Sequence, residues 1–183
     1  MFLSIPIEYI QSNCIYFKEK KDNIIIQNGY FIPIQYATNT LVINTLFISL
    51  VFQDIKCNVQ QYYKKCILQN DKNHALIQYI IQLEYDILNR FHTTKIRTYT
   101  IKQQMENGLF KIFSCKDQNQ SNCEYILDTC TCYIRISGIW ENDTHIGLIY
   151  KILTDYGTLE TEDITTPLQI QSIVQHNTIL SEA

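Results

Sequence analysis

The chain contains few of the residues that let a backbone turn tightly: its 183 residues include five glycines, three prolines and three alanines. It has no glycine-rich phosphate loop of the P-loop or dinucleotide-binding kind, because such loops need several closely spaced glycines. The G-x-S-x-G and H-E-x-x-H motifs are also absent. The sequence therefore argues against the common nucleotide-hydrolysing, dehydrogenase, esterase and metalloprotease classes, and we expect a protein that is not an enzyme.

Long apolar runs are missing as well. The longest runs from Leu46 to Phe52, well below the ~20 residues that cross a bilayer, and it predicts a core strand. Pro6 and Glu8 interrupt the apolar residues that follow Met1, so we expect no secretory leader. These features predict no membrane association.

The seven cysteines have no regular spacing, and no C-x₂₋₄-C pair is present, so the sequence predicts neither a metal site nor a cofactor. Cys130 and Cys132 lie two residues apart in a predicted strand, which directs both thiols to one face, most simply into the core. Reduced core thiols are typical of a reducing intracellular compartment.

Ile, Asn, Gln, Tyr and Thr are abundant, which indicates an AT-rich genome and favours strands. Asn28-Gly29, between Ile24–Ile26 and Tyr30–Ile32, predicts a hairpin. Leu41–Phe52 predicts a further strand, and residues 55–70 are compatible with either a helix or a strand. Later strands are predicted at Leu109–Cys115, Cys130–Trp140 and Ile146–Leu153, the last two joined by a turn at Glu141–His145. Gly138 and Gly147 lie inside these strands and indicate a bulge or a close approach of backbones.

One segment has a helical period. Leu76, Ile80, Leu83, Ile87 and Phe91 recur every three or four residues, with Ile77, Ile81 and Leu88 beside them. This pattern predicts a helix over about 74–91, with Asp71 or Asn73 as its cap and Arg90 near its C-terminus. A shorter helix is predicted at Thr98–Asn107, ended by Gly108.

The order of these elements predicts a β-rich α+β fold: either an OB-like barrel or a strongly bent antiparallel sheet, with one main helix. Residues 1–153 form the predicted globular domain and carry a charge balance of +2. Residues 154–183 contain five acidic and no basic residues and form a predicted acidic tail. A flexible anionic tail can occupy a cationic groove or recruit replication proteins.

The isolated titratable residues give weaker signals. His74, His92, His145 and His176 stand in four unrelated contexts and predict no catalytic centre. Two carboxylate pairs have structural explanations: Glu84 and Asp86 on the polar side of the predicted helix, and Glu141 and Asp143 in the predicted turn. We expect none of them to be catalytic.

Basic and aromatic residues gather in the second half of the chain. Single strands are bound by cations that follow the phosphates and by aromatic faces that stack on bases. The residues predicted to form such a nucleic-acid-binding groove are Lys95, Arg97, Tyr99, Lys102, Lys111, Phe113, Arg135, Trp140, Tyr150 and Lys151. Because the chain contains 22 aromatic residues, packing in the core is the competing explanation for each ring.

The stretch from about His74 to Leu153, above all Ile134–Lys151 with "ISGIW" and "GLIYK", resembles the OB-fold single-stranded-DNA-binding proteins of large nucleocytoplasmic DNA viruses. The resemblance covers less than half of the chain and does not include residues 1–73. It implies an OB barrel with a helix between its third and fourth strands, cooperative coating of DNA, no catalytic residues, and a role in viral DNA replication or recombination.

Three functions remain open at this point. The first is binding of single-stranded nucleic acid without sequence preference. The second is a viral structural or scaffold role as a minor capsid or core component, with self-association. The third is action on a host protein through residues 154–183. For each we expect an intracellular location, in a viral factory or the nucleus, or in the virion.

Overall fold

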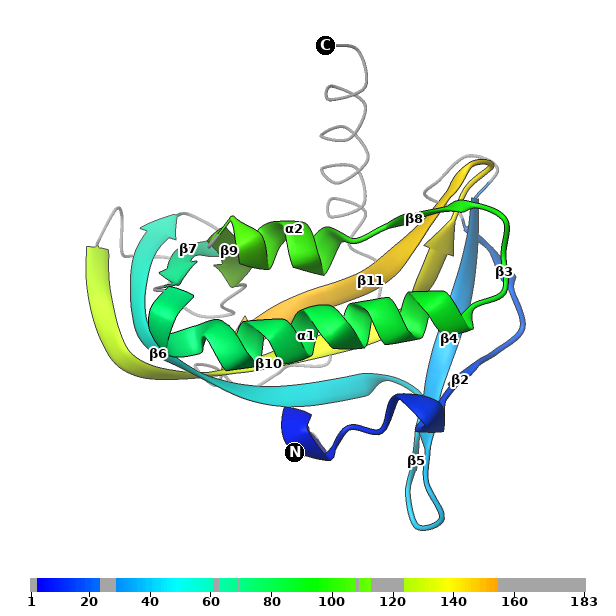
Figure 1. Cartoon of the computed structure of the whole chain (residues 1–183), viewed down its shortest axis with the longest axis horizontal. Coiled ribbons are helices and arrows are strands. Elements are labelled where there is room, and N and C mark those ends of the chain that lie inside the picture. Colours follow the sequence, from blue (N-terminus) through cyan, green and yellow to red (C-terminus); the bar gives the residue numbers. More distant parts are fainter. Residues whose placement is uncertain are drawn as a thin grey trace.

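The structure is a computed structural model that describes residues 3–23, 29–60, 63–68, 70–107, 109–112 and 124–154. Over these residues one eleven-stranded sheet is accompanied by two α-helices (Figure 1). The strands are β1 (Ile5–Pro6), β2 (Ile15–Phe17), β3 (Lys21–Asn23), β4 (Gly29–Ala37), β5 (Val42–Ile43), β6 (Leu46–Gln60), β7 (Tyr63–Leu68), β8 (Ile96–Thr98), β9 (Leu109–Ile112), β10 (Glu124–Glu141) and β11 (His145–Thr154). The helices are α1 (Asn70–Arg90) and α2 (Thr100–Glu106), and two short 3₁₀ turns lie at Ile7–Tyr9 and Ser12–Cys14.

Strand β10 is the centre of the sheet. Along one edge it pairs first with β6 over Glu124–Ile136 and then with β4 over Gly138–Glu141. Along the other edge it pairs with β11 from Cys132 to Glu141. The register shifts between Ile136 and Gly138, where β4 replaces β6 as the neighbour. One long strand therefore joins the two parts of the sheet.

The sheet is strongly bent, and over the described residues it does not close into a barrel (Figure 1). Of the two predicted architectures, the β-rich α+β fold with a bent sheet is confirmed, whereas the OB-like barrel is not formed. The sheet is also not purely antiparallel, since β1 pairs with β6 and β8 pairs with β11 in parallel. A second irregularity lies at Asp54 of β6, which is not among the residues paired with β10 and has a positive φ of 49°.

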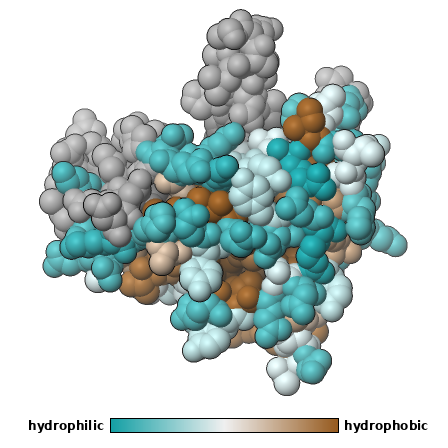
Figure 2. Space-filling model, in the orientation of Figure 1, coloured by the Kyte–Doolittle hydropathy of each residue, from teal (hydrophilic) through white to brown (hydrophobic). Residues whose placement is uncertain are grey.

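Helix α1 covers one face of the sheet, which we call the inner face. Its predicted apolar stripe is confirmed, because Ile77, Ile80, Ile87 and Leu88 are buried against the core and Leu76 and Phe91 are partly buried there. Inward positions of β6 (Leu46, Ile48, Leu50, Phe52) and β10 (Cys130, Cys132, Ile134, Ile136) supply the other side of that core by strict alternation. The opposite face of α1 is exposed, and the view from this side is largely hydrophilic (Figure 2).

Several boundaries differ from those predicted. Residues 55–70, which were compatible with helix or strand, continue β6 to Gln60, form β7 and begin α1 at Asn70. Because α1 begins there, Asp71 and Asn73 lie inside the helix instead of capping it. The predicted strand at Leu41–Phe52 is divided into β5 and β6. In the first hairpin Asn23 pairs with Gly29, the first residue of β4. Residues 24–28, which include Asn28 of the predicted Asn28-Gly29 turn, lie outside the described residues.

The turn between β10 and β11 is confirmed. Asn142 Oδ1 accepts hydrogen bonds from the backbone N–H groups of Thr144 (3.0 Å) and His145 (2.7 Å), which closes the hairpin. The short helix α2 is also confirmed, although Gly108 lies outside the described residues. The described chain ends at Thr154, so the predicted acidic tail falls outside it except for that residue. No helix in the described ranges is long and apolar enough to cross a membrane.

Candidate functional site

Among the residues predicted to form one groove, those that the structure describes lie on two opposite sides of the sheet. On β11, Gly147 and Lys151 share one face, and the buried Leu148 and Ile152 share the other with the partly buried Tyr150 by alternation. The side opposite α1 we call the open face; it is defined by Phe31, Phe47, Tyr133, Arg135, Trp140 and Lys151. Among the described residues no helix packs on it.

On the inner side, Arg97 and Lys95 have structural roles. Arg97 Nε donates to the backbone oxygen of Leu88 (3.0 Å), and a second guanidinium nitrogen donates to that of Phe91 (3.5 Å). These bonds satisfy carbonyl groups at the C-terminal end of α1, where cations are favoured. Lys95 is held in a separate network around Glu141.

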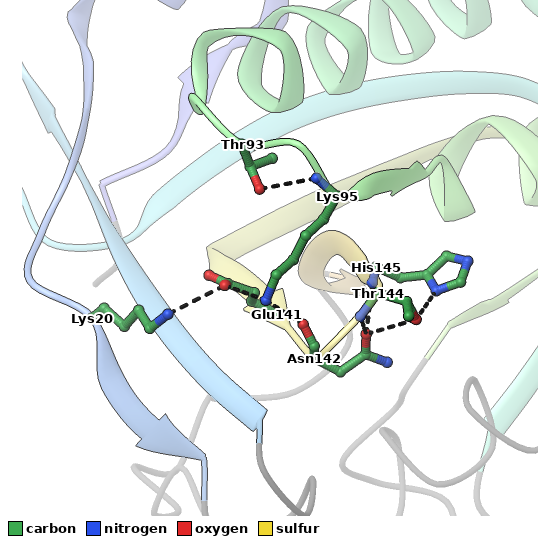
Figure 3. A network of polar contacts seen from close by, with 7 residues as sticks. All are labelled: Lys20, Thr93, Lys95, Glu141, Asn142, Thr144 and His145. Carbon is green, nitrogen blue, oxygen red and sulfur yellow. Dashed lines mark hydrogen bonds and ion pairs between the residues drawn. The ribbon is translucent and has the colours of Figure 1, made fainter.

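Glu141 is the acceptor at the centre of that network (Figure 3). Lys95 Nζ lies 2.6 Å and Lys20 Nζ 3.2 Å from its Oε1, and Lys95 also donates to the backbone oxygen of Asn142. Burial opposes ionisation of Glu141, but the two lysine hydrogen bonds outweigh it and hold the pKa of this carboxyl below its usual value. The network joins three distant segments of chain at the end of β10, and in it the Lys95 ammonium group is paired with Glu141.

Tyr99, Lys102 and Tyr150 lie together on the inner side. The Tyr99 ring packs on Tyr85 with centroids 4.3 Å apart, and Lys102 Nζ donates to the Tyr85 hydroxyl (2.9 Å). The Tyr150 hydroxyl is buried, and burial raises the pKa of this phenol. These three residues are therefore brought together, but within the packing between α1, α2 and β11.

The open face brings Arg135 and Lys151 directly opposite each other across the β10–β11 pair. On the other side of Arg135 its partner is Phe47 of β6, and the guanidinium carbon lies 5.7 Å from the centroid of that ring. Arg135 Nε is buried and has no hydrogen-bond partner among the described residues. Two cations and a ring thus form one row across three strands, with Tyr133 one step along β10 on the same face.

Trp140 belongs to the open face but is only 7% exposed. Its direct partners are Phe31 of β4 and Gly147 of β11. The ring lies over Gly147, since a Cβ at that position would stand 2.6 Å from Trp140 Nε1. This confirms the predicted close approach at Gly147, and the competing explanation, packing, holds for this ring. The predicted close approach at Gly138 is also confirmed, because a Cβ at that position would stand 2.3 Å from the Ile32 backbone oxygen.

The remaining predicted residues are not placed. Lys111 lies in β9, whose side chains are outside the described part of the structure, and Phe113 is outside it entirely. Within the described part, no group of three or more His, Cys, Asp and Glu side chains could hold a metal ion. Cys130 and Cys132 are buried with their Sγ atoms 3.6 Å apart, as predicted for thiols that share one face.

The expectation that Glu84 lies on the polar side of its helix is wrong: the residue is fully buried. Its carboxylate accepts the backbone N–H groups of Ile101 (3.0 Å) and Lys102 (2.8 Å) in the first turn of α2. Burial raises the pKa of Glu84 to about 7, although these hydrogen bonds act in the opposite direction. The position is three or four residues from Ile80, Ile81, Ile87 and Leu88, so the helical period itself places it on the apolar stripe.

Comparisons with known proteins give no relative from which to transfer a function: no family model, no curated protein and no solved structure matches this chain.

Proposed function

We propose that the chain binds single-stranded nucleic acid, without sequence preference, on the open face of its sheet. Arg135 and Lys151 are the phosphate-binding cations, and Phe47 and Tyr133 present the rings next to them. The observation that carries the proposal is the direct pairing of Arg135 with Lys151. This pairing places two cationic side chains next to each other on one face, which is the arrangement that a chain of phosphates requires.

The chemistry of the row suits a nucleotide backbone. A guanidinium near an aromatic ring can still donate hydrogen bonds from its edge to a phosphate, and the Arg135 guanidinium carbon lies 5.7 Å from the centroid of the Phe47 ring. Side chains two residues apart on one strand are separated by roughly 7 Å, which is close to one step of an extended single strand. Phe47 and Tyr133 are half-buried on this face. Sheets that bind single-stranded RNA stack bases on aromatic rings of one face.

The proposal differs from the one that the sequence suggested. Lys95, Arg97, Tyr99, Lys102 and Tyr150 are not part of the proposed surface, because each is used in packing or hydrogen bonding on the inner side. Trp140 packs beneath the proposed surface and is too buried to stack on a base. The resemblance of residues 74–153 to viral single-stranded-DNA-binding proteins remains the reason to propose DNA as the ligand and viral DNA replication or recombination as the setting.

Fluorescence anisotropy with labelled oligo-dT tests the proposal directly. We expect preference for oligo-dT over duplex, and an affinity that falls with salt. Two phosphate contacts give a slope of log K against log salt of about −1.4, and Arg135→Gln or Lys151→Gln should reduce it to about −0.7. Lys102→Gln is the matched control, since it removes one cation from the opposite side of the sheet. Equal loss in all three variants, or no preference for the single strand, would contradict the proposal.

A second candidate function is a viral structural or scaffold role through protein contacts. Tyr16 (52% exposed) and Val42 (62% exposed) lie on one face of the small β2–β4–β5 unit. Exposed apolar side chains that gather on one face are typical of protein interaction sites. Sedimentation of the wild type against Val42→Asp distinguishes the two candidates: a self-association that this substitution abolishes, together with indifference to oligo-dT, favours the scaffold role.

A further inference from the structure

Lys21 is an exposed cation that lies beside an aromatic ring on the open face. It belongs to β3 and is the direct partner of Phe31 in β4, which in turn is the direct partner of Trp140 in β10. Direct partners across antiparallel strands have their side chains on the same face. Lys21 and Phe31 therefore share the open face with Trp140, and neither is among the residues that the sequence predicted for the groove.

The two neighbours of Lys21 in the chain agree with this orientation. Lys20 Nζ lies 3.2 Å from Glu141 Oε1 and 3.6 Å from the centroid of the Tyr30 ring, on the inner side (Figure 3). Asp22 is the direct partner of Tyr30 and shares that side. Because side chains alternate along a strand, the Lys21 side chain between them is directed to the open face.

The ring of Phe31 lies against a glycine of the next strand. A Cβ at Gly138 would stand 2.5 Å from Phe31 Cε2, just as a Cβ at Gly147 would stand 2.6 Å from Trp140 Nε1. Phe31 is half-buried, whereas Trp140 is buried. Phe31 is therefore the ring of this row that a base can reach from solvent.

The strands around Lys21 supply no counter-charge on this face. Strands β4 and β11 contain no Asp or Glu. The carboxylate of β10 in the same row of residues, Glu141, is paired with Lys20 and Lys95 on the inner side. Among the described residues no carboxylate forms an ion pair with Lys21. Its charge is available to an anionic ligand.

Two similar groups of side chains thus lie on one face. The first is the row that contains Arg135 and Lys151, and the second is Lys21 with Phe31. Each combines positive charge with an aromatic ring, which are the two components that bind single strands. Lys151 and Gly147 mark the two rows on β11 and are four residues apart, so the rows are separated by roughly 13 Å along the strand.

We propose that Lys21 and Phe31 form a second subsite for the same single strand, in which Lys21 binds a phosphate and Phe31 stacks on a base. The inference rests on the proposed function and adds the path of the ligand, which crosses β10 obliquely from the row of Arg135 toward β3. Trp140, the sole tryptophan, is the direct partner of Phe31, so its emission reports on a base at this subsite.

The salt dependence of oligo-dT binding counts the phosphate contacts. A third contact changes the slope to about −2.1, so the affinity should fall about 18-fold between about 50 and 200 mM salt. In Lys21→Gln we expect a slope of about −1.4, which is a fall of about 7-fold over the same range. Lys20→Gln is the matched control, because it removes the same charge one residue away, from the inner side, and should keep the wild-type slope.

The outcomes separate this inference from the proposed function. A wild-type slope of about −1.4 that Arg135→Gln reduces and Lys21→Gln leaves unchanged would overturn the second subsite and support the first. Equal loss in Lys21→Gln and Lys20→Gln would also overturn the second subsite, since binding would then follow net charge and not one face. A wild type without salt-dependent preference for the single strand would contradict both.

The emission of Trp140 gives a second measurement, which does not depend on counting charges. We expect saturating oligo-dT to change the emission of the wild type, because a base on Phe31 lies beside the indole. Phe31→Leu, with its fold checked by circular dichroism, should reduce this change at saturation. Should that variant fail to fold, the wild-type titration decides: emission that saturating oligo-dT leaves unaltered would rule out this path.

Discussion

Trp140 lies flat against Gly147, its direct partner across the β10–β11 pair, and the absent Cβ of the glycine is what leaves room for the indole. Because this is the sole tryptophan of the chain, its fluorescence reports on that contact. The neighbouring Gly138 allows β4 to approach β10 at the point where β6 leaves it. Gly147 therefore allows Trp140 to pack on the open face, and Gly138 allows β4 to replace β6 as the neighbour of β10.

Gly147→Ala is expected to lower the free energy of unfolding by about 1–3 kcal/mol, because the added Cβ would stand within 2.8 Å of three indole atoms. Urea unfolding followed by circular dichroism measures the loss, and tryptophan emission should shift to longer wavelength as the ring moves outward. Thr129→Ala, an exposed change on β10, is the control and should change neither signal. An unchanged emission maximum in Gly147→Ala would show that the ring is not held by this contact.

Asn73 is expected to be among the costliest polar side chains to remove. Its Oδ1 accepts the Gln53 backbone N–H (2.8 Å) and its Nδ2 donates to the Gln53 backbone oxygen (2.8 Å), beside the left-handed Asp54. Asn73→Leu leaves both backbone groups unpaired and should lower the free energy of unfolding by about 2–4 kcal/mol. Lys72→Ala, which removes the exposed ion pair with Asp54, should lower the free energy of unfolding much less than Asn73→Leu does. Chemical denaturation of the two variants gives the ranking.

The two lysines on Glu141 are expected to differ in importance. Lys95 is 24% exposed and has a second acceptor in the Asn142 backbone oxygen, whereas Lys20 is 43% exposed and 3.2 Å from the carboxylate. Lys95→Met should therefore cost about 2 kcal/mol of unfolding free energy, and Lys20→Met less than about 1 kcal/mol. Because the pKa of Glu141 is lowered, its contribution is present above the unfolded value of 4.5 and is lost as the pH falls further. Equal costs for the two lysine variants would argue against this ranking.

Glu84 should give the stability the opposite dependence on pH. Its pKa is raised from 4.5 to about 7, so between these values the folded chain binds a proton that the unfolded chain does not. Its contribution is complete below pH 4.5 and is lost as the pH rises through 7, by up to about 3 kcal/mol. Denaturation between pH 5 and pH 8 should show this decline in the wild type and a flatter profile in Glu84→Gln. A profile that is unaltered by the substitution would assign the decline to another group.

The helix and most of the strands could be predicted because their signals are local. The three-and-four spacing from Leu76 to Phe91 and the alternation from Leu46 to Phe52 each specify which side chains face the core. The same reasoning, applied to position 84, would have placed Glu84 on the buried stripe. It was assigned to the polar side because of its charge, and no local feature of the sequence indicates that the first turn of α2 would supply its donors.

The residues predicted to form one groove do not share one face of the sheet. The reason is again the alternation of side chains along a strand. Tyr150 and Lys151 are adjacent in sequence and so must point to opposite faces of β11. Which cations face the same side depends on the β10 register shift between Ile136 and Gly138 and on the pairing of Arg135 with both Phe47 and Lys151. These are pairings between segments up to about a hundred residues apart, and composition gives no information about them.

The sequence by itself determined the class of the fold, the long helix and its apolar face, the hairpin at Asn142 and the close approaches at Gly138 and Gly147, because each depends on neighbours along one segment. Only the tertiary structure decided that the sheet bends without closing over the described residues. It also decided that Lys95 pairs with Glu141 and Arg97 with the end of α1, while Arg135 lies opposite Lys151. The physical reason is that a side chain's role is set by the groups that the fold brings to it. Those groups come from strands and helices far away in the chain.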